Sequence, residues 1–90
     1  MRRRCRVVVT GRVQNIGLRA LTRRQAAHQG LGGWVRNELD GTVTLEVEGE
    51  AAEVARLVQW LRGSPTFSQV EALTVTDLEP IGEQQFVIKH

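Results

Sequence analysis

The apolar residues of this chain follow two different periods, and the order in which the periods alternate limits the folds that the chain can adopt. Alternating or β-branched runs predict strands over residues 5–10, 32–38, 42–48 and 70–78, and a last short strand over 86–89. Good helix formers predict helices over residues 18–29 and 50–62, each followed by a glycine. The order strand, helix, strand, strand, helix, strand is typical of a ferredoxin-like α+β sandwich, with two helices packed on one face of an antiparallel sheet. We expect the last segment to add a short extra edge strand at the C-terminus.

A length of 90 residues suits a single domain over residues 1–90 with one small core. Hydrophobic residues make up 41% of the chain and charged residues 24%, as in ordinary globular domains. No apolar stretch approaches the ~20 residues of a membrane span, so no membrane association is expected. Residues 2–4 are all arginine and precede the first predicted strand, and we expect residues 1–4 to form a flexible basic arm.

Composition also bears on partners and compartment. Aromatic residues are only 4% and the net charge is only +2, whereas base-stacking modules depend on exposed aromatics, so nucleic acid is not an expected partner. The single cysteine, Cys5, excludes a disulfide within the chain and a multi-cysteine zinc site. His28 and His90 have no partners at ligand spacing, and no metal site is predicted. The lack of disulfides fits a cytoplasmic protein, and we expect a monomer.

The most regular alternation lies in residues 42–48. Val43, Leu45 and Val47 share one face, and threonines and glutamates share the other. This pattern predicts a strand that is buried on one face only. Glu46 and Glu48 are therefore expected to face solvent and not to act as an acid–base pair.

Residues 11–17, between the first strand and the first helix, form the strongest candidate for a functional loop. Such a junction exposes unpaired N–H groups at the start of the helix, which together with the helix dipole favour a bound phosphate. Gly11 and Gly17 permit close approach of the backbone to a ligand. Arg19 follows in the first helical turn, where a guanidinium suits bidentate binding of phosphate oxygens. The alternative interpretation is that Arg19 is a solvated surface arginine.

Asn37 is a second candidate, because asparagine is disfavoured inside strands. Its amide offers both a donor and an acceptor, which suits holding a water molecule in one orientation. The alternative interpretation is that Asn37 ends the strand before the turn at Asp40 and Gly41.

Residues 11–19, GRVQNIGLR, resemble the acylphosphatase signature G-R-V-Q-G-V-x-F-R. Residues 33–37, GWVRN, with the following Gly41, Val43 and Gly49, resemble the second signature of that family at the family's spacing. The resemblance implies hydrolysis of small acyl phosphates to a carboxylate and phosphate, without a metal or cofactor. It also implies that Arg19 binds the phosphoryl group and that Asn37 orients the attacking water. The residues whose backbone amides would cradle the phosphate are Gln14, Asn15, Ile16, Gly17 and Leu18.

Two positions depart from the family pattern. Asn15 replaces the usual glycine and Leu18 replaces the usual aromatic residue. Asparagine tolerates a left-handed backbone, which would preserve the loop, but it is also a good N-cap whose side chain would compete for the phosphate-binding amides. Leu18 is expected to fill the same core position with less volume. The alternatives to an acylphosphatase are a non-catalytic phosphate- or RNA-binding ferredoxin-like module and the acylphosphatase-like segment of a larger carbamoyl-transferring maturation enzyme.

Overall fold

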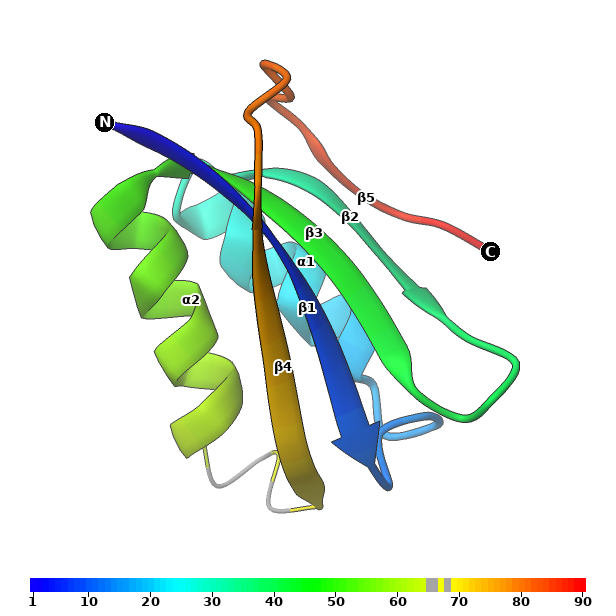
Figure 1. The fold of residues 1–90 in the computed structure, drawn as a ribbon. Helices are drawn as coiled ribbons and strands as arrows, with labels where there is room; N and C mark the ends of the chain where they lie inside the picture. Colours follow the sequence, from blue (N-terminus) through cyan, green and yellow to red (C-terminus); the bar gives the residue numbers. More distant parts are fainter. Residues whose placement is uncertain (65–66, 68) are drawn as a thin grey trace.

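The computed structural model describes residues 1–64, 67 and 69–90, which form two helices packed on one face of a five-stranded sheet (Figure 1). The elements in chain order are β1 (Arg2–Gly11), α1 (Leu18–His28), β2 (Gly32–Asn37), β3 (Val43–Glu50), α2 (Ala51–Gly63), β4 (Val70–Leu78) and β5 (Phe86–Ile88). The strand order in the sheet is β4-β1-β3-β2-β5. The predicted ferredoxin-like fold is thereby confirmed, including the extra edge strand.

Neighbouring strands of the sheet are antiparallel, except at one edge. β1 pairs antiparallel with both β3 and β4, and β2 pairs antiparallel with β3. β5 pairs parallel to β2, so the sheet is mixed and not purely antiparallel. β4 and β5 are the two edges, and β3 is the central strand.

The core lies between the sheet and the two helices. Alternate residues of β1 and β3, such as Val7 and Leu45, are fully buried toward the helices. The apolar stripe of α2 is buried as its period predicts, through Val54, Leu57, Val58 and Leu61. The weaker stripe of α1 buries Leu18, Thr22 and Ala26. Each large side chain buried in this way contributes about 1.5–3 kcal/mol to folding.

The expectation that residues 1–4 form a flexible basic arm is wrong. Arg2, Arg3 and Arg4 are part of β1 and pair with β3 in register from Arg2 opposite Glu50 onward. Only 3% of the surface of Arg4 is exposed. The tract is ordered because each arginine meets a carboxylate: Arg2 and Arg4 bind Glu48, and Arg3 binds Asp77 of β4.

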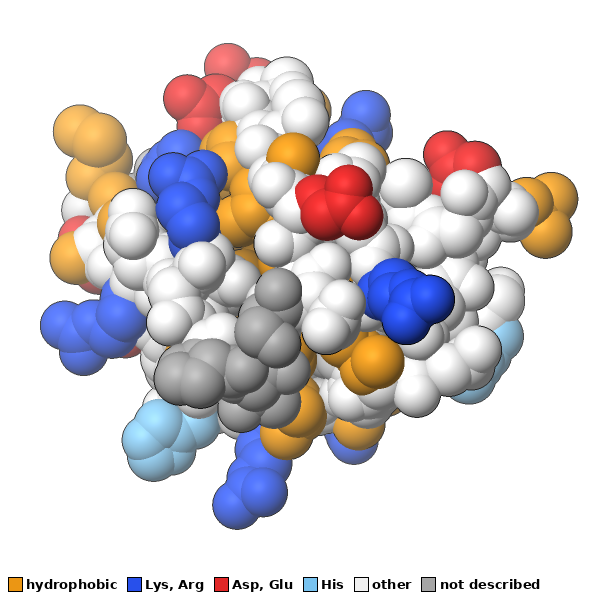
Figure 2. Space-filling view, turned by 90° about the horizontal axis from the view of Figure 1, so that it is seen from below, with side chains coloured by type: hydrophobic (Ala, Val, Ile, Leu, Met, Phe, Trp, Pro, Cys, Tyr) orange, Lys and Arg blue, Asp and Glu red, His pale blue; other side chains and the backbone are white. Residues whose placement is uncertain are grey.

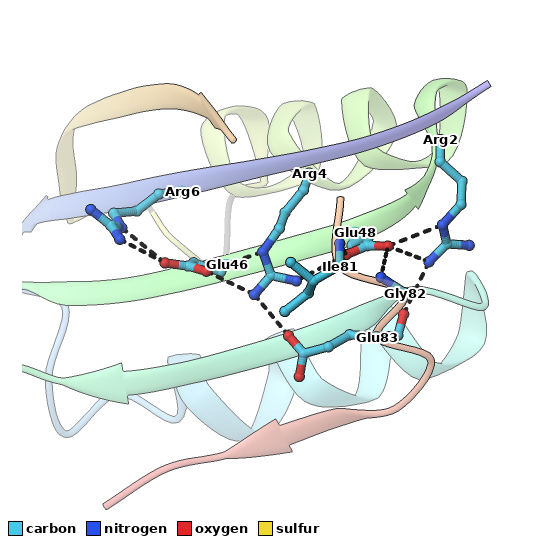
Figure 3. A network of polar contacts seen from close by, with 8 residues as sticks. All are labelled: Arg2, Arg4, Arg6, Glu46, Glu48, Ile81, Gly82 and Glu83. Atoms are coloured by element: carbon cyan, nitrogen blue, oxygen red, sulfur yellow. Dashed lines mark hydrogen bonds and ion pairs between the residues drawn. The ribbon is translucent and has the colours of Figure 1, made fainter. Parts of the chain in front are cut away.

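The expectation that Glu46 and Glu48 face solvent is also wrong. Both are buried, Glu48 completely, because β3 is the central strand and its second face is covered (Figure 3). Arg4 and Arg6 of β1 form ion pairs with these two glutamates. The backbone N–H groups of Ile81 and Gly82 donate to Glu48, near the C-terminal end of β3. Gly32 makes this close approach possible, since a Cβ atom there would overlap the carbonyl of Glu83.

Candidate active site

The loop between β1 and α1 leaves the first turn of the helix uncapped by any side chain. Gly17 occupies the N-cap position with a left-handed backbone, φ 80°, and no side-chain hydrogen bond caps the helix. Asn15 is also left-handed, at φ 64°. The loop shape expected of a glycine is therefore kept, and the Asn15 carboxamide does not cap the helix. The first-turn N–H groups remain available to an anion.

A cavity of about 170 Å³ opens against this loop. It is lined by Val13, Asn15, Gly17, Leu18, Arg19, Ala20, Asn37, Ile88 and His90. Arg19 and Asn37, which lie on separate elements, are thus brought to one site together with the start of α1. The sequence indicated each of them independently, and the fold places them together.

Arg19 is the only Lys, Arg, Asp or Glu among the described residues that line the cavity. It is partly exposed, and within the described residues no carboxylate lies within ion-pair distance of its guanidinium. The arginines of β1, by contrast, all have acidic partners. Arg19 can therefore accept an anion without first breaking an existing ion pair.

Asn37 is the last residue of β2, paired with Val43 of β3, and its side chain is partly buried. Both interpretations of this residue thus describe its position: it ends the strand before the turn, and it lines the cavity. Its carboxamide offers both a donor and an acceptor, which is what a water-positioning group requires.

The remaining predicted residues take different positions. Asn15, Gly17 and Leu18 line the cavity, and Leu18 is buried in the core as expected. Gln14 instead donates its side-chain amide to the carbonyls of Glu38, at 2.8 Å, and Thr42, at 3.0 Å. Gln14 therefore fastens the loop to the β2–β3 turn. Ile16 packs against the core, and the backbone-amide roles of Gln14 and Ile16 stay predictions.

Two cavity residues, Ile88 and His90, were missed by the sequence interpretation. Ile88 ends β5, and His90 follows two residues later. They reach the cavity because β5 runs parallel to β2, so that Ile88 lies opposite Val35. No local pattern in the sequence signals this pairing, which depends on the return of the chain to the far edge of the sheet.

The face of the molecule that includes the β1–α1 junction carries scattered charges. Viewed from the end of the sheet where β1 leads into α1, lysine and arginine side chains are spread over the face and do not form one continuous patch (Figure 2). Within the described residues, no group of three or more His, Cys, Asp or Glu side chains is placed to hold a metal ion. In the same part of the chain, no helix is long and apolar enough to cross a membrane.

Two helices on one face of a five-stranded sheet, with a small cavity where β1 leads into α1, make this a ferredoxin-like α+β protein. The Acylphosphatase family model matches residues 5–88, and the chain belongs to the acylphosphatase family. Members of this family are hydrolases of acyl phosphates, and the predicted family and type of activity are confirmed.

Individual relatives agree. The chain is 42% identical to an acylphosphatase of Nocardioides sp. over 89 residues, which is 99% of this chain and 90% of the relative. Its structure resembles the crystal structure of acylphosphatase from Bacillus subtilis with a TM-score of 0.88 and 35% identity, covering 100% of both chains. It also shares its fold, at 24% identity and a TM-score of 0.90, with a segment that is 12% of full-length HypF.

Proposed function

We propose that the chain hydrolyses the carboxyl–phosphate bond of small acyl phosphates in the cavity between the β1–α1 loop and Asn37. The observation that carries this proposal is that Arg19, which has no acidic partner among the described residues, and the strand-end Asn37 line the same cavity as the start of α1. The arrangement supports the roles that the family resemblance implies: Arg19 and the amides of residues 14–18 bind the phosphoryl group, and Asn37 orients the water.

The chemistry needs little beyond binding and orientation. Water attacks phosphorus, the bond from phosphorus to the acyl oxygen breaks, and the carboxylate leaves with the electron pair. A carboxylate is a good leaving group, so no acid has to protonate it. The proton of the water passes to a phosphate oxygen, which suits a cavity whose described lining contains no Asp or Glu side chain. Charge on the phosphoryl oxygens is neutralised by the guanidinium and the helix-start amides.

The size of the cavity supports a small substrate. A water molecule occupies about 30 Å³, so the cavity of about 170 Å³ has the volume of roughly six water molecules. A phosphoryl group takes part of this space, and Val13, Leu18 and Ile88 give the rest an apolar lining. Such a lining favours a compact apolar acyl group.

The assay that tests the proposal is the release of phosphate from benzoyl phosphate with a chelator present. Turnover by the purified protein that is unaffected by the chelator is the expected result. Binding of orthophosphate without turnover would favour a non-catalytic phosphate-binding module, and absence of both would refute the proposed site.

We also propose that the protein is a cytoplasmic monomer. A buried free thiol at Cys5 and no disulfide in so small a chain support a reducing compartment. The exposed large hydrophobic residues of the described structure lie on separate segments, at Met1, Leu39, Ile81 and Val87. Cell fractionation and light scattering during size-exclusion chromatography test these two statements.

A further inference from the structure

Glu48 is a fully buried carboxylate that accepts five hydrogen bonds (Figure 3). Oε1 accepts from the backbone N–H of Ile81, at 2.9 Å, and from Arg4 Nη1, at 3.0 Å. Oε2 accepts from the backbone N–H of Gly82, at 2.8 Å, and from Arg2 Nη2 and Nε, at 2.7 and 3.0 Å. One side chain of the central strand thus joins β1, β3 and the segment that follows β4.

Two further contacts hold this segment, residues 79–85, against the sheet. Arg2 Nη2 donates to the carbonyl of Glu83 at 3.1 Å, and Arg4 Nη2 lies 2.7 Å from Glu83 Oε1 as an ion pair. The segment packs so closely on β2 that only glycine fits at Gly32. Residues 81–83 are therefore fixed by partly buried and exposed polar contacts on the face of the sheet opposite the helices (Figure 3).

The fixed segment leads directly into β5, which has only 3 residues and one strand neighbour. Gly33 donates to the carbonyl of Gln85 at 2.9 Å, and Lys89 donates to that of Val35 at 2.8 Å. So short an edge strand is weakly held by its own ladder. The position of residues 79–85, which lead into β5, therefore helps to determine where β5 lies.

β5 supplies one wall of the cavity through Ile88, and His90 extends it. The other functional groups of the site come from the β1–α1 loop, from α1 and from the end of β2. None of these elements follows residues 79–85 in the chain. A shift of that segment would consequently move the β5 wall and leave the phosphate-binding groups in place.

We propose that Glu48 is a positioning residue for substrate binding: it fixes residues 81–83 and, through them, β5, so that Ile88 and His90 form the wall that contacts the acyl group. This inference rests on the proposed hydrolysis of acyl phosphates. Glu48 is ionised in this role at working pH. Burial by itself raises the pKa of its carboxyl, but the hydrogen bonds from Ile81, Arg2, Gly82 and Arg4 lower that pKa to about 2.

The test compares Glu48→Gln, which keeps the shape of the side chain but removes its charge, with Glu50→Gln. Glu50 ends the same strand, is exposed, and pairs only with the N-terminal ammonium among the described groups. For Glu48→Gln we expect KM for benzoyl phosphate to rise about 5- to 10-fold, with kcat and the inhibition constant of orthophosphate within about twofold of wild type. Glu50→Gln should match wild type in all three.

A substitution in the cavity wall itself tests whether Glu48 acts through Ile88. Ile88→Ala should give the same rise in KM with an unchanged inhibition constant for orthophosphate. In the double variant Glu48→Gln/Ile88→Ala, KM should rise no further than in the more affected single variant, because both changes act on one wall. Equal rises in KM and in the orthophosphate constant would overturn the proposal, as would an unchanged KM in folded Glu48→Gln.

Two additional measurements test the inference if Glu48→Gln does not fold or if the wild-type protein is inactive. If Glu48→Gln fails to fold, Glu83→Gln replaces it, and an unchanged KM there would overturn the proposal; an increase of about two- to threefold is expected. The NMR signals of Ile88 and His90 should shift in Glu48→Gln, or in Glu83→Gln if that variant replaces it. They should stay unchanged in Glu50→Gln. Unchanged NMR signals in the variant would refute the positioning role. This measurement does not depend on activity, so it also applies if the wild-type protein is inactive. An inactive wild-type protein would separately refute the proposed function.

Discussion

Arg4 and Glu48 form a buried ion pair between neighbouring strands, with Nη1 and Oε1 3.0 Å apart and only 4% and 0% of the two side chains exposed. The pair lies on the face of the sheet that carries no helix (Figure 3). Burying two charges costs several kcal/mol of solvation, which their attraction and added hydrogen bonds must offset. Part of this face is therefore covered by a network of ion pairs in place of a second apolar layer.

The ionisation of Glu48 makes stability depend on acidic pH. Its pKa is about 2 in the folded protein against an ordinary value of 4.5, so the stabilisation is complete above pH 4.5 and is lost as pH falls towards 2. A difference of this size corresponds to at most about 3 kcal/mol of unfolding free energy. Urea midpoints measured between pH 7 and 2.5 should fall through this window. A folded Glu48→Gln variant with the same slope as wild type would contradict the assignment.

Replacement of Arg19 by alanine should abolish most activity without unfolding the protein, because the side chain has no acidic partner among the described residues and lines the cavity. We expect kcat/KM for benzoyl phosphate to fall at least about 100-fold. Arg62→Ala, which removes an exposed arginine from the last turn of α2, is the matched control. Wild-type rates in Arg19→Ala would rule out the proposed site.

Removal of the Asn37 amide should affect turnover more than binding. In Asn37→Ala, kcat should fall at least about tenfold while the inhibition constant of orthophosphate stays within about twofold, since the attacking water loses its orientation and the phosphate keeps its ligands. Steady-state kinetics with product inhibition measures both values. A weakened orthophosphate affinity with unchanged kcat would assign Asn37 to phosphate binding instead.

Asn15→Gly tests whether the departure from the family signature matters. The carboxamide does not cap α1 and the backbone is already left-handed, so the glycine variant should keep its fold and change orthophosphate affinity by less than about twofold. Titration calorimetry measures this affinity. A clear gain in affinity would show that the Asn15 side chain competes for the amides in solution.

Thr22 offers a test of the packing between α1 and the sheet. It is completely buried, and its hydroxyl has no hydrogen-bond partner within the described structure. Thr22→Val keeps the branched shape and removes the unsatisfied hydroxyl, which should raise the unfolding free energy by about 1 kcal/mol. Thr76→Val on β4, where the side chain is exposed, should change it by less than about 0.5 kcal/mol. Thermal and urea unfolding measure both, and a destabilised Thr22→Val would contradict the explanation.

The fold was predictable because its signals are local. Val70–Leu78 forms β4 as expected, and the spacing of Val54 and Leu61 reveals the buried side of α2. Alternation in β3 shows which residues share a face but not what lies on that face. Glu48 was therefore misplaced, since its cover comes from Ile81 and neighbouring residues in a segment without periodicity.

The site was predictable in part for the same reason. Arg19 is marked by its place at a strand–loop–helix junction, and Asn37 by a residue type that is unusual in a strand. Ile88 and His90 left no such signal, because they approach the cavity only through the parallel pairing of β5 with β2. Contacts made by distant strands require the three-dimensional arrangement.

The open edge at β4 also affects how copies of this molecule meet one another. Glu71 and Asp77 are exposed near its two ends. Antiparallel stacking of two such edges about Thr74 would set Glu71 of each copy directly against Asp77 of the other. Like charges placed opposite each other are unfavourable, so the open side of this edge strand disfavours pairing with a second copy and growth into fibrils.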